Sequence, residues 1–254
     1  MHEVRHGFPG MLGSLDCMHW GWKNCPKAWH GAYTRGDQGE PTLILEAVAS
    51  HDLWIWHAFF GVAGSNNDIN VLNQSPLFAD VLDGTAPPVL FQANHRYYQM
   101  GYYLCDGIYP EWRCFVKSPP MATNQKEARF KKMQESARKD VERAFGVLQA
   151  RWGIIRSPAR NWYLEHLRDI MLCCIILHNM IVEHEGEGAT NWRDDDAGHG
   201  ASSSDSTESG RATPVSFEEY VQRDALLRDR QLHAALQYDL MEHVWARFGS
   251  LGPE

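Results

Sequence analysis

The sequence lacks an apolar run long enough to cross a lipid bilayer. A membrane-spanning helix needs about 18 or more consecutive apolar residues, whereas the longest run here is the short stretch Ile170–Leu177. The N-terminus also lacks the basic, apolar and small-residue segments of a secretory signal peptide. We therefore expect a soluble, intracellular protein that makes no membrane contact.

The chain is also poor in cysteine patterns. Its six cysteines are Cys17, Cys25, Cys105, Cys114, Cys173 and Cys174. None forms a CxxC pair, and two adjacent cysteines do not suit a disulfide framework. The scattered histidines have no zinc-ligand spacing relative to them. The pattern predicts buried free thiols in a reducing compartment, either the cytosol or the nucleus.

An overall excess of basic residues is absent too, because the net charge is −8. The charge is unevenly distributed, however. Residues 113–160 hold 12 Lys and Arg against 4 Asp and Glu, whereas residues 186–254 hold 6 against 13. A phosphate backbone responds to the local field and not to the net charge of the chain. The basic segment is compatible with nucleic-acid binding, and equally with a solvated helix face.

Composition divides the chain into three regions. Residues 8–185 are dense in apolar and aromatic side chains and predict one folded domain. Residues 186–214 are rich in Gly, Ser and Asp and predict a disordered acidic linker. Residues 215–248 regain helical periodicity and predict a C-terminal helix.

The first region alternates strand-like and helical segments. The expected strands are Met11–Cys17, Thr42–Ser50, Leu53–Val62, Tyr102–Cys105 and Cys114–Lys117, the second and third forming a hairpin. One or two short helices are expected over residues 67–81, a long helix from Thr123, and another over residues 163–185. This order predicts an α/β fold with a mixed sheet flanked by helices.

Three carboxylates occupy unusual places in this pattern. Asp16 closes an apolar strand, Asp106 follows the strand YYLC, and Glu142 borders the apolar stripe of the long helix. Carboxylates from different elements can hold Mg²⁺ or Mn²⁺, which are hard cations that prefer oxygen ligands. Two such ions can activate a water or 3′-hydroxyl and stabilise the leaving oxygen of a phosphodiester. From residue types alone, ordinary surface or hydrogen-bonded acids remain an alternative.

Several longer motifs occur in order along the chain. They are GSLDCMHW (13–20), HDLWIWHAFFG (51–61), GSNNDINVLNQSP (64–76), YYLCDGIYPEW (102–112), ARKDVERAFGVLQARW (137–152), LHNMIVE (177–183) and MEHVWARFG (241–249). On these motifs the chain resembles the plant branch of PIF/Harbinger-type DDE transposases, which includes domesticated Harbinger-derived nucleases. The likeness covers about residues 8–185.

The resemblance implies an RNase H-like fold and a metal-binding catalytic triad of Asp16, Asp106 and Glu142. Asp106 matches the D-x-x-Y-P motif and Glu142 the V-E-R-x-F-G motif, with 35 residues between them. It further implies two Mg²⁺ or Mn²⁺ ions and transposon-end DNA as the substrate. The expected activity is endonucleolytic cleavage followed by strand transfer.

Two further residues in these motifs are accessory candidates. Asp68 could assist metal or DNA, or could cap the helix that follows it. His19 could orient the triad or contact a phosphate, or could be a packed, hydrogen-bonded histidine. The residues leave both alternatives open.

The long basic helix supplies candidates for DNA contacts. Lys139, Arg143 and Arg151 are expected to bind backbone phosphates. Such contacts give affinity without sequence preference, so binding should weaken steeply with salt.

Family members generally begin well before the first catalytic aspartate, so this chain resembles the catalytic half of a longer ancestor. The resemblance implies a Myb-like partner protein that supplies further DNA binding and nuclear import, and a homo-oligomer is compatible with it. The alternative function is a domesticated or decayed nuclear interaction protein without nuclease activity. A non-nuclease metal enzyme on the same fold, such as a phosphatase, is disfavoured by the motifs.

Overall fold

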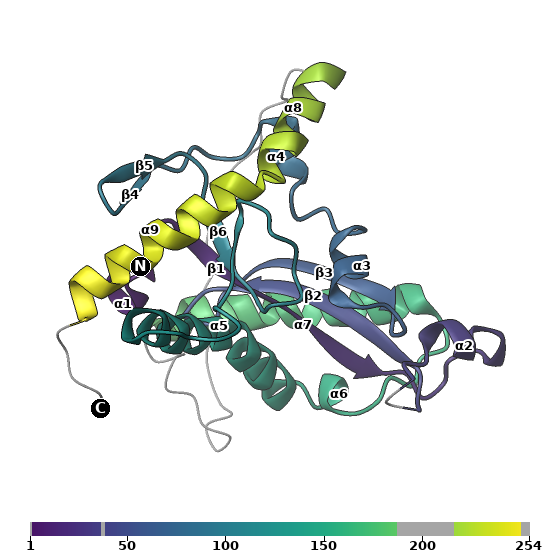
Figure 1. The fold of residues 1–254 in the computed structure, drawn as a ribbon. Coiled ribbons are helices and arrows are strands. Elements are labelled where there is room, and N and C mark those ends of the chain that lie inside the picture. Colours follow the sequence, from purple (N-terminus) through teal and green to yellow (C-terminus); the bar gives the residue numbers. More distant parts are fainter. Residues whose placement is uncertain (1, 37–38, 187–215, 250–254) are drawn as a thin grey trace. The chain divides into compact units, whose positions relative to one another are not determined.

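The structure is a computed structural model that describes residues 2–36, 39–186 and 216–249 (Figure 1). Its helices are α1 (His2–His6), α2 (His30–Tyr33), α3 (Asp68–Leu72), α4 (Ala79–Asp83), α5 (Gln125–Arg151), α6 (Gly153–Arg156), α7 (Leu164–Glu185), α8 (Phe217–Leu227) and α9 (Arg230–Phe248). Its strands are β1 (Met11–Gly21), β2 (Thr42–Ala49), β3 (Ile55–Ala63), β4 (Phe91–Ala93), β5 (Arg96–Tyr98), β6 (Tyr102–Leu104) and β7 (Phe115–Val116). None of the described helices is long and apolar enough to span a bilayer.

The main sheet is mixed and has the strand order β3-β2-β1-β6-β7. Strands β2 and β3 form an antiparallel hairpin, as the sequence predicts, whereas β6 pairs in parallel with both β1 and β7. Helices flank this sheet, so the α/β, RNase H-like fold class is confirmed. The parallel pairs need crossover connections, and residues 22–101, between β1 and β6, provide one of them.

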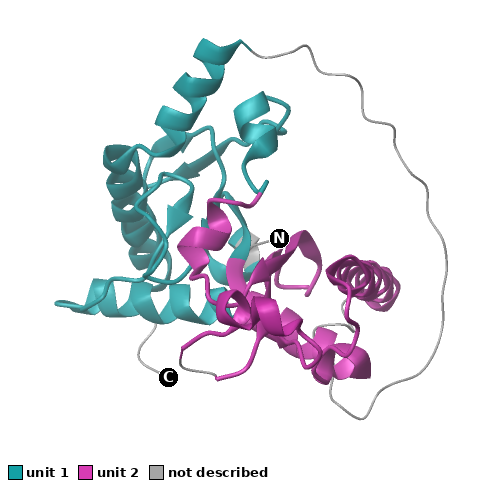
Figure 2. Ribbon diagram, turned by 90° about the vertical axis from the view of Figure 1, so that its right-hand side faces the viewer, with its two compact units in different colours: residues 1–14, 76–139, 206–254 teal, residues 15–75, 140–205 magenta. Residues whose placement is uncertain are grey.

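Residue contacts divide the chain into two compact units (Figure 2). Unit 1 comprises residues 1–14, 76–139 and 206–254, and unit 2 comprises residues 15–75 and 140–205. Both β1 and α5 contribute residues to each unit. The predicted linker, residues 186–214, lies outside the described residues except for Gly186.

Unit 2 is organised around β2, which is buried along its whole length. Its apolar residues pack with one face of α7, whose buried side chains include Leu167, Met171 and Ile175. This burial on both faces explains why the TLILEAVA segment of β2 is mostly apolar without alternation, with Thr42 and Glu46 as its buried polar residues.

Helix α7 also holds the beginning of β3 by polar contacts. The side chain of Asn179 accepts a hydrogen bond from Ile55 N at 2.9 Å and donates one to Ile55 O at 2.8 Å. Its neighbour His178 bonds through Nε2 to Leu53 O at 2.8 Å. Strand β3 is the last strand of the sheet, so these side chains satisfy backbone groups where the β2–β3 ladder ends. The LHN motif therefore has a structural role.

Unit 1 has its own core, formed by β6, β7, the first half of α5, and α9. Its buried residues include Phe8, Tyr102, Phe130 and Leu240, with the Phe8 and Phe130 rings in edge contact at 5.8 Å. The periodicity predicted for the long helix is confirmed, because Phe130 and Ala137 are buried in unit 1 and three later stripe residues are buried in unit 2. Those three are Val141, Ala144 and Leu148.

Three sequence predictions need correction, and one hairpin was missed. Strand β1 continues to Gly21, so Asp16 lies inside the strand and not at its end. The C-terminal segment forms two helices, because Asp229 caps a new helix through bonds from Gln231 N and Leu232 N.

The β4–β5 hairpin was not predicted. Its turn places Asn94 and His95 at positive φ, a conformation that asparagine tolerates. Finally, Cys173 is an exposed thiol and Cys17 a half-buried one, although all six cysteines are free as expected.

Candidate functional site

Asp106 lies just after β6, at the carboxyl end of a parallel strand. Its side chain is half-buried, and its Oδ1 accepts a hydrogen bond from Ile108 N at 2.9 Å. This bond closes a tight turn over Gly107, which fixes the carboxylate at the strand end. Asp106 also lines an open cavity in unit 1 with a volume of about 710 Å³. The sequence prediction of a carboxylate projecting from the end of this strand is confirmed.

One wall of the cavity is formed by α5 and is mainly basic. The α5 side chains that line it are those of Ala128, Lys131, Lys132, Glu135, Ser136, Arg138 and Lys139. Four cations therefore face two acids, Asp106 and Glu135. Lys131 lies 3.9 Å from Glu135, and both side chains are partly exposed, so this ion pair neutralises little of the field. A cavity with this charge suits an anionic ligand that also carries a metal ion.

Gln134 ties α5 to the strand that carries Asp106. Its buried Nε2 donates to Cys105 O at 3.0 Å and to Val116 O at 3.1 Å, the terminal carbonyls of the β6 and β7 region. Ser14 adds a second tie, because its Oγ donates to Ala137 O at 2.8 Å. These bonds set the position of the peptide that precedes Asp106.

We predict that Gln134→Leu destabilises the folded state by about 2 kcal/mol. The substitution keeps the side-chain volume but removes both donors, and each lost bond to a buried carbonyl costs about 1 kcal/mol. Urea unfolding measures the change, with Gln149→Leu, on the same helix, as the control. Equal stability of wild type and Gln134→Leu would show that these two bonds contribute nothing to the fold.

Asp16 is half-buried within β1 in unit 2, and its Oδ1 accepts from the amide of Cys17 at 2.8 Å. Three residues further on, His19 bonds through Nδ1 to Thr42 Oγ1 at 2.8 Å, and its Nε2 lies 3.4 Å from Arg35 Nη1. Both ring nitrogens of His19 thus have protein partners, which is the packed and hydrogen-bonded alternative.

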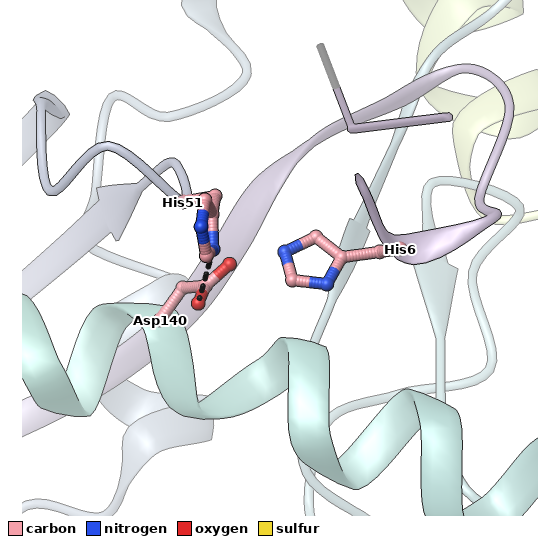
Figure 3. A group of neighbouring side chains, drawn as sticks. All are labelled: His6, His51 and Asp140. Atoms are coloured by element: carbon pink, nitrogen blue, oxygen red, sulfur yellow. Dashed lines mark hydrogen bonds and ion pairs between the residues drawn. The ribbon is translucent and has the colours of Figure 1, made fainter. Parts of the chain in front are cut away.

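Glu142, which the sequence places at the border of the apolar stripe of α5, has an exposed side chain. Asp140 takes the inward position and is buried. Its Oδ1 lies 3.3 Å from His51 Nδ1 and 3.2 Å from Arg143 Nη1; Figure 3 shows the contact with His51. The sequence contained a signal for this, because Asp140 is three residues after Ala137 and four before Ala144, inside the apolar stripe. An acid in that stripe needs polar partners.

The three predicted phosphate contacts have different surroundings. Lys139 is exposed and lines the cavity. Arg143 pairs with Asp140, as described. The side chain of Arg151 is 6% exposed and forms an ion pair with Glu185, so its charge is used inside unit 2.

Asp68 is the first residue of α3 and not its cap. The cap is Asn67, whose side chain accepts from Asn70 N. Asp68 stands in the first turn, where a negative charge interacts favourably with the helix dipole. The capping interpretation was therefore wrong by one residue.

Comparison with known proteins gives the chain relatives. A family model described as plant transposon protein matches residues 1–189. A protein named Protein ALP1-like from Arabidopsis thaliana is 27% identical over 198 residues, which cover 73% of this chain and 46% of that protein. The chain thus spans about half the length of this curated relative. No solved structure matches.

Proposed function

The chain belongs to the plant transposon protein family, and on that premise we propose that it is a divalent-metal-dependent DNA endonuclease and strand-transferase domain. The observation that carries this proposal is the cavity of unit 1. There, the carboxylate of Asp106, at the end of a parallel strand, lines the same cavity as Lys131, Arg138 and Lys139. A DNA phosphodiester is an anion that needs both a metal-binding acid and nearby cations.

The residues fit a hard divalent ion. We propose that Asp16, Asp106 and Glu142 hold Mg²⁺ or Mn²⁺, since each offers carboxylate oxygens: Asp16 in β1, Asp106 in the turn after β6 and Glu142 on α5. One oxygen of Asp106 is engaged by Ile108 N, and a carboxylate has about four acceptor positions, so capacity for a cation remains. When bound, such ions activate a water or 3′-hydroxyl and stabilise the leaving oxygen.

The protein's own cations would hold the substrate. Arg138 and Lys139 lie one helical turn before Glu142, so phosphates bound by them are next to one of the proposed ligands along α5. Arg138 can bind a phosphate through two parallel N–H donors, whereas Lys139 acts as a point charge. These contacts orient the scissile strand without reading its sequence.

Thermal unfolding with and without Mn²⁺ tests the metal site. Mn²⁺ at about ten times its dissociation constant should stabilise wild type by roughly 1.4 kcal/mol. Asp106→Asn, Asp16→Asn and Glu142→Gln should each lose most of that shift. Asp83→Asn, an exposed acid on α4 of unit 1, is the matched control and should keep it. Nicking of supercoiled plasmid in Mn²⁺ then measures activity. A folded wild type without a shift or nicking contradicts the proposal.

An interaction protein without nuclease activity is the second candidate. Helix α7 favours it, because several large apolar side chains on one face of this helix are exposed: Leu172, Ile176, Leu177 and Met180. Partner binding that survives alanine at all three acids, without nicking, would favour this candidate. Nuclear location and a Myb-like partner stay predictions.

A further inference from the structure

Two segments of unit 2 lie side by side although they are far apart in the sequence. Residues 22–33 follow β1, and residues 156–163 run from the last residue of α6 to the residue before α7. Lys23 N donates to Ala159 O at 2.9 Å, and Trp22 Nε1 donates to Asn161 O at 2.8 Å. We call the exposed side of these two segments the aromatic-basic surface.

Three large aromatic side chains are exposed on this surface. The exposed fractions are 44% for Trp29, 54% for Trp162 and 63% for Tyr163. Trp29 is held in place by its neighbours. Its ring stacks on Tyr33 and packs against the buried Trp22, with a distance of 5.9 Å between ring centroids in each pair. A ring that is already ordered loses little side-chain entropy when a ligand stacks on it.

The charge of this surface is of one sign. Residues 22–33 and 156–163 contain Lys23, Lys27, Arg156 and Arg160 but no Asp or Glu, in a chain whose net charge is −8. Lys23, Lys27 and Arg160 are exposed. Aromatic faces combined with exposed cations match the two parts of a nucleotide, its base and its phosphate.

We propose that the aromatic-basic surface binds single-stranded DNA, with bases stacked on Trp29, Trp162 or Tyr163 and phosphates on the neighbouring Lys and Arg side chains. A duplex is a poorer ligand for these rings, because its base faces are covered by the adjacent base pairs. An acidic protein would satisfy the cations but not the rings. This inference deepens the proposed function, since a cleavage and joining reaction leaves DNA ends whose strands can separate.

The test measures binding of fluorescein-labelled oligo(dT) of about 20 nucleotides by anisotropy. The full chain carrying Asp106→Asn is used in EDTA, so metal and catalysis do not contribute. Trp162→Ala and Tyr163→Ala should each weaken binding about five-fold or more, as expected for loss of one stacked base. Trp56→Ala is the matched control, because Trp56 is 66% exposed on β3, a strand without Lys or Arg. It should leave binding unchanged.

Charge and competing explanations are tested with the same assay. Arg160→Gln should reduce the slope of log affinity against log salt by about 0.7, the value for one single-strand phosphate. Unchanged affinity in both aromatic variants overturns the proposal. So does a loss of self-association in those variants by sedimentation, which would make the surface a protein contact. Failure of nicking with intact, aromatic-dependent oligo(dT) binding would count against the proposed function alone.

Discussion

The free energy of unfolding is expected to fall by roughly 3 kcal/mol between pH 7 and pH 4 through His178 alone. His178 is fully buried on α7. Its pKa is lowered from 6.5 to about 4, chiefly by burial; the bond to Leu53 O opposes this shift and the charge of Arg151 adds to it. The native imidazole is therefore neutral, with Nε2–H donating to Leu53 O and Nδ1 facing Arg151 Nη1 at 3.4 Å.

The direction of this dependence follows from proton binding. Between pH 6.5 and pH 4 the unfolded chain binds a proton at His178 that the folded chain does not bind. Stability is therefore fully present above pH 6.5 and declines as pH falls toward 4. Protonation of His178 in the folded protein would place an N–H on Nδ1 against the Arg151 guanidinium. This contact lies in unit 2, where His178 and Asn179 of α7 bind the backbone at Leu53 and at the start of β3.

Urea unfolding at several pH values between 4 and 7 measures this effect. His178→Gln keeps a donor near Nε2 but cannot titrate, so the fall in stability should shrink by most of the 3 kcal/mol. His184→Gln, an exposed histidine on the same helix, should retain the full dependence. The same pH dependence in His178→Gln and wild type would show that His178 is not the group responsible. Other buried histidines contribute equally to both proteins, so the difference isolates His178.

Asp239→Ala is expected to destabilise unit 1 by about 3 kcal/mol or more. Asp239 is buried on α9 and accepts from Asn94 Nδ2 at 2.8 Å and from Tyr98 OH at 2.5 Å. Arg96 Nη1 lies 3.6 Å from its Oδ2. This one carboxylate thus fastens the short β4–β5 hairpin to α9. Burial, and then the hydrogen bond to Asp239, raises the pKa of Tyr98, so its hydroxyl remains a donor throughout the working pH range.

Alanine at this position leaves two donors without their acceptor, and each hydrogen bond to a charged group is worth about 1.5–3 kcal/mol. Tyr98→Phe removes only one of them and should cost about half as much. Asp224→Ala breaks an exposed pair with Arg228 on α8 and should change stability by less than about 1 kcal/mol. Urea unfolding of the three variants tests this order. Similar losses for Asp239→Ala and Asp224→Ala would refute the role given to burial.

The sequence predicted well those features that depend on local pattern. The spacing of Phe130, Ala137, Val141, Ala144 and Leu148 correctly predicted a long helix and its buried stripe. Alternating strands and helices predicted the mixed sheet. The turn after YYLC predicted that Asp106 projects from a strand end. The helix and the strand end depend on neighbouring residues, where side-chain size and backbone preference act directly, and the mixed sheet depends on the order of the elements.

Predictions about direction were less successful at the edges of patterns. Glu142 and Asp140 are two residues apart on one helix, and a rotation of about 100° per residue separates an exposed acid from a buried one. The sequence places Glu142 at the border of the apolar stripe, whereas the structure exposes Glu142 and buries Asp140 against His51 and Arg143. Asp140 is buried together with a partner, His51, that is 89 positions away in the sequence.

The amino-acid sequence by itself determined the family motifs, the positions of the strands and long helices, and the basic character of residues 113–160. Only the tertiary structure decided which of those cations line the cavity beside Asp106 and that Arg151 is consumed by Glu185. It alone brought Trp22 against Asn161 and so brought the segments that carry Trp29 and Trp162 together. The physical reason is that hydrogen bonds and ion pairs of this kind join residues more than 30 positions apart, and a local pattern carries no information about which distant group completes them.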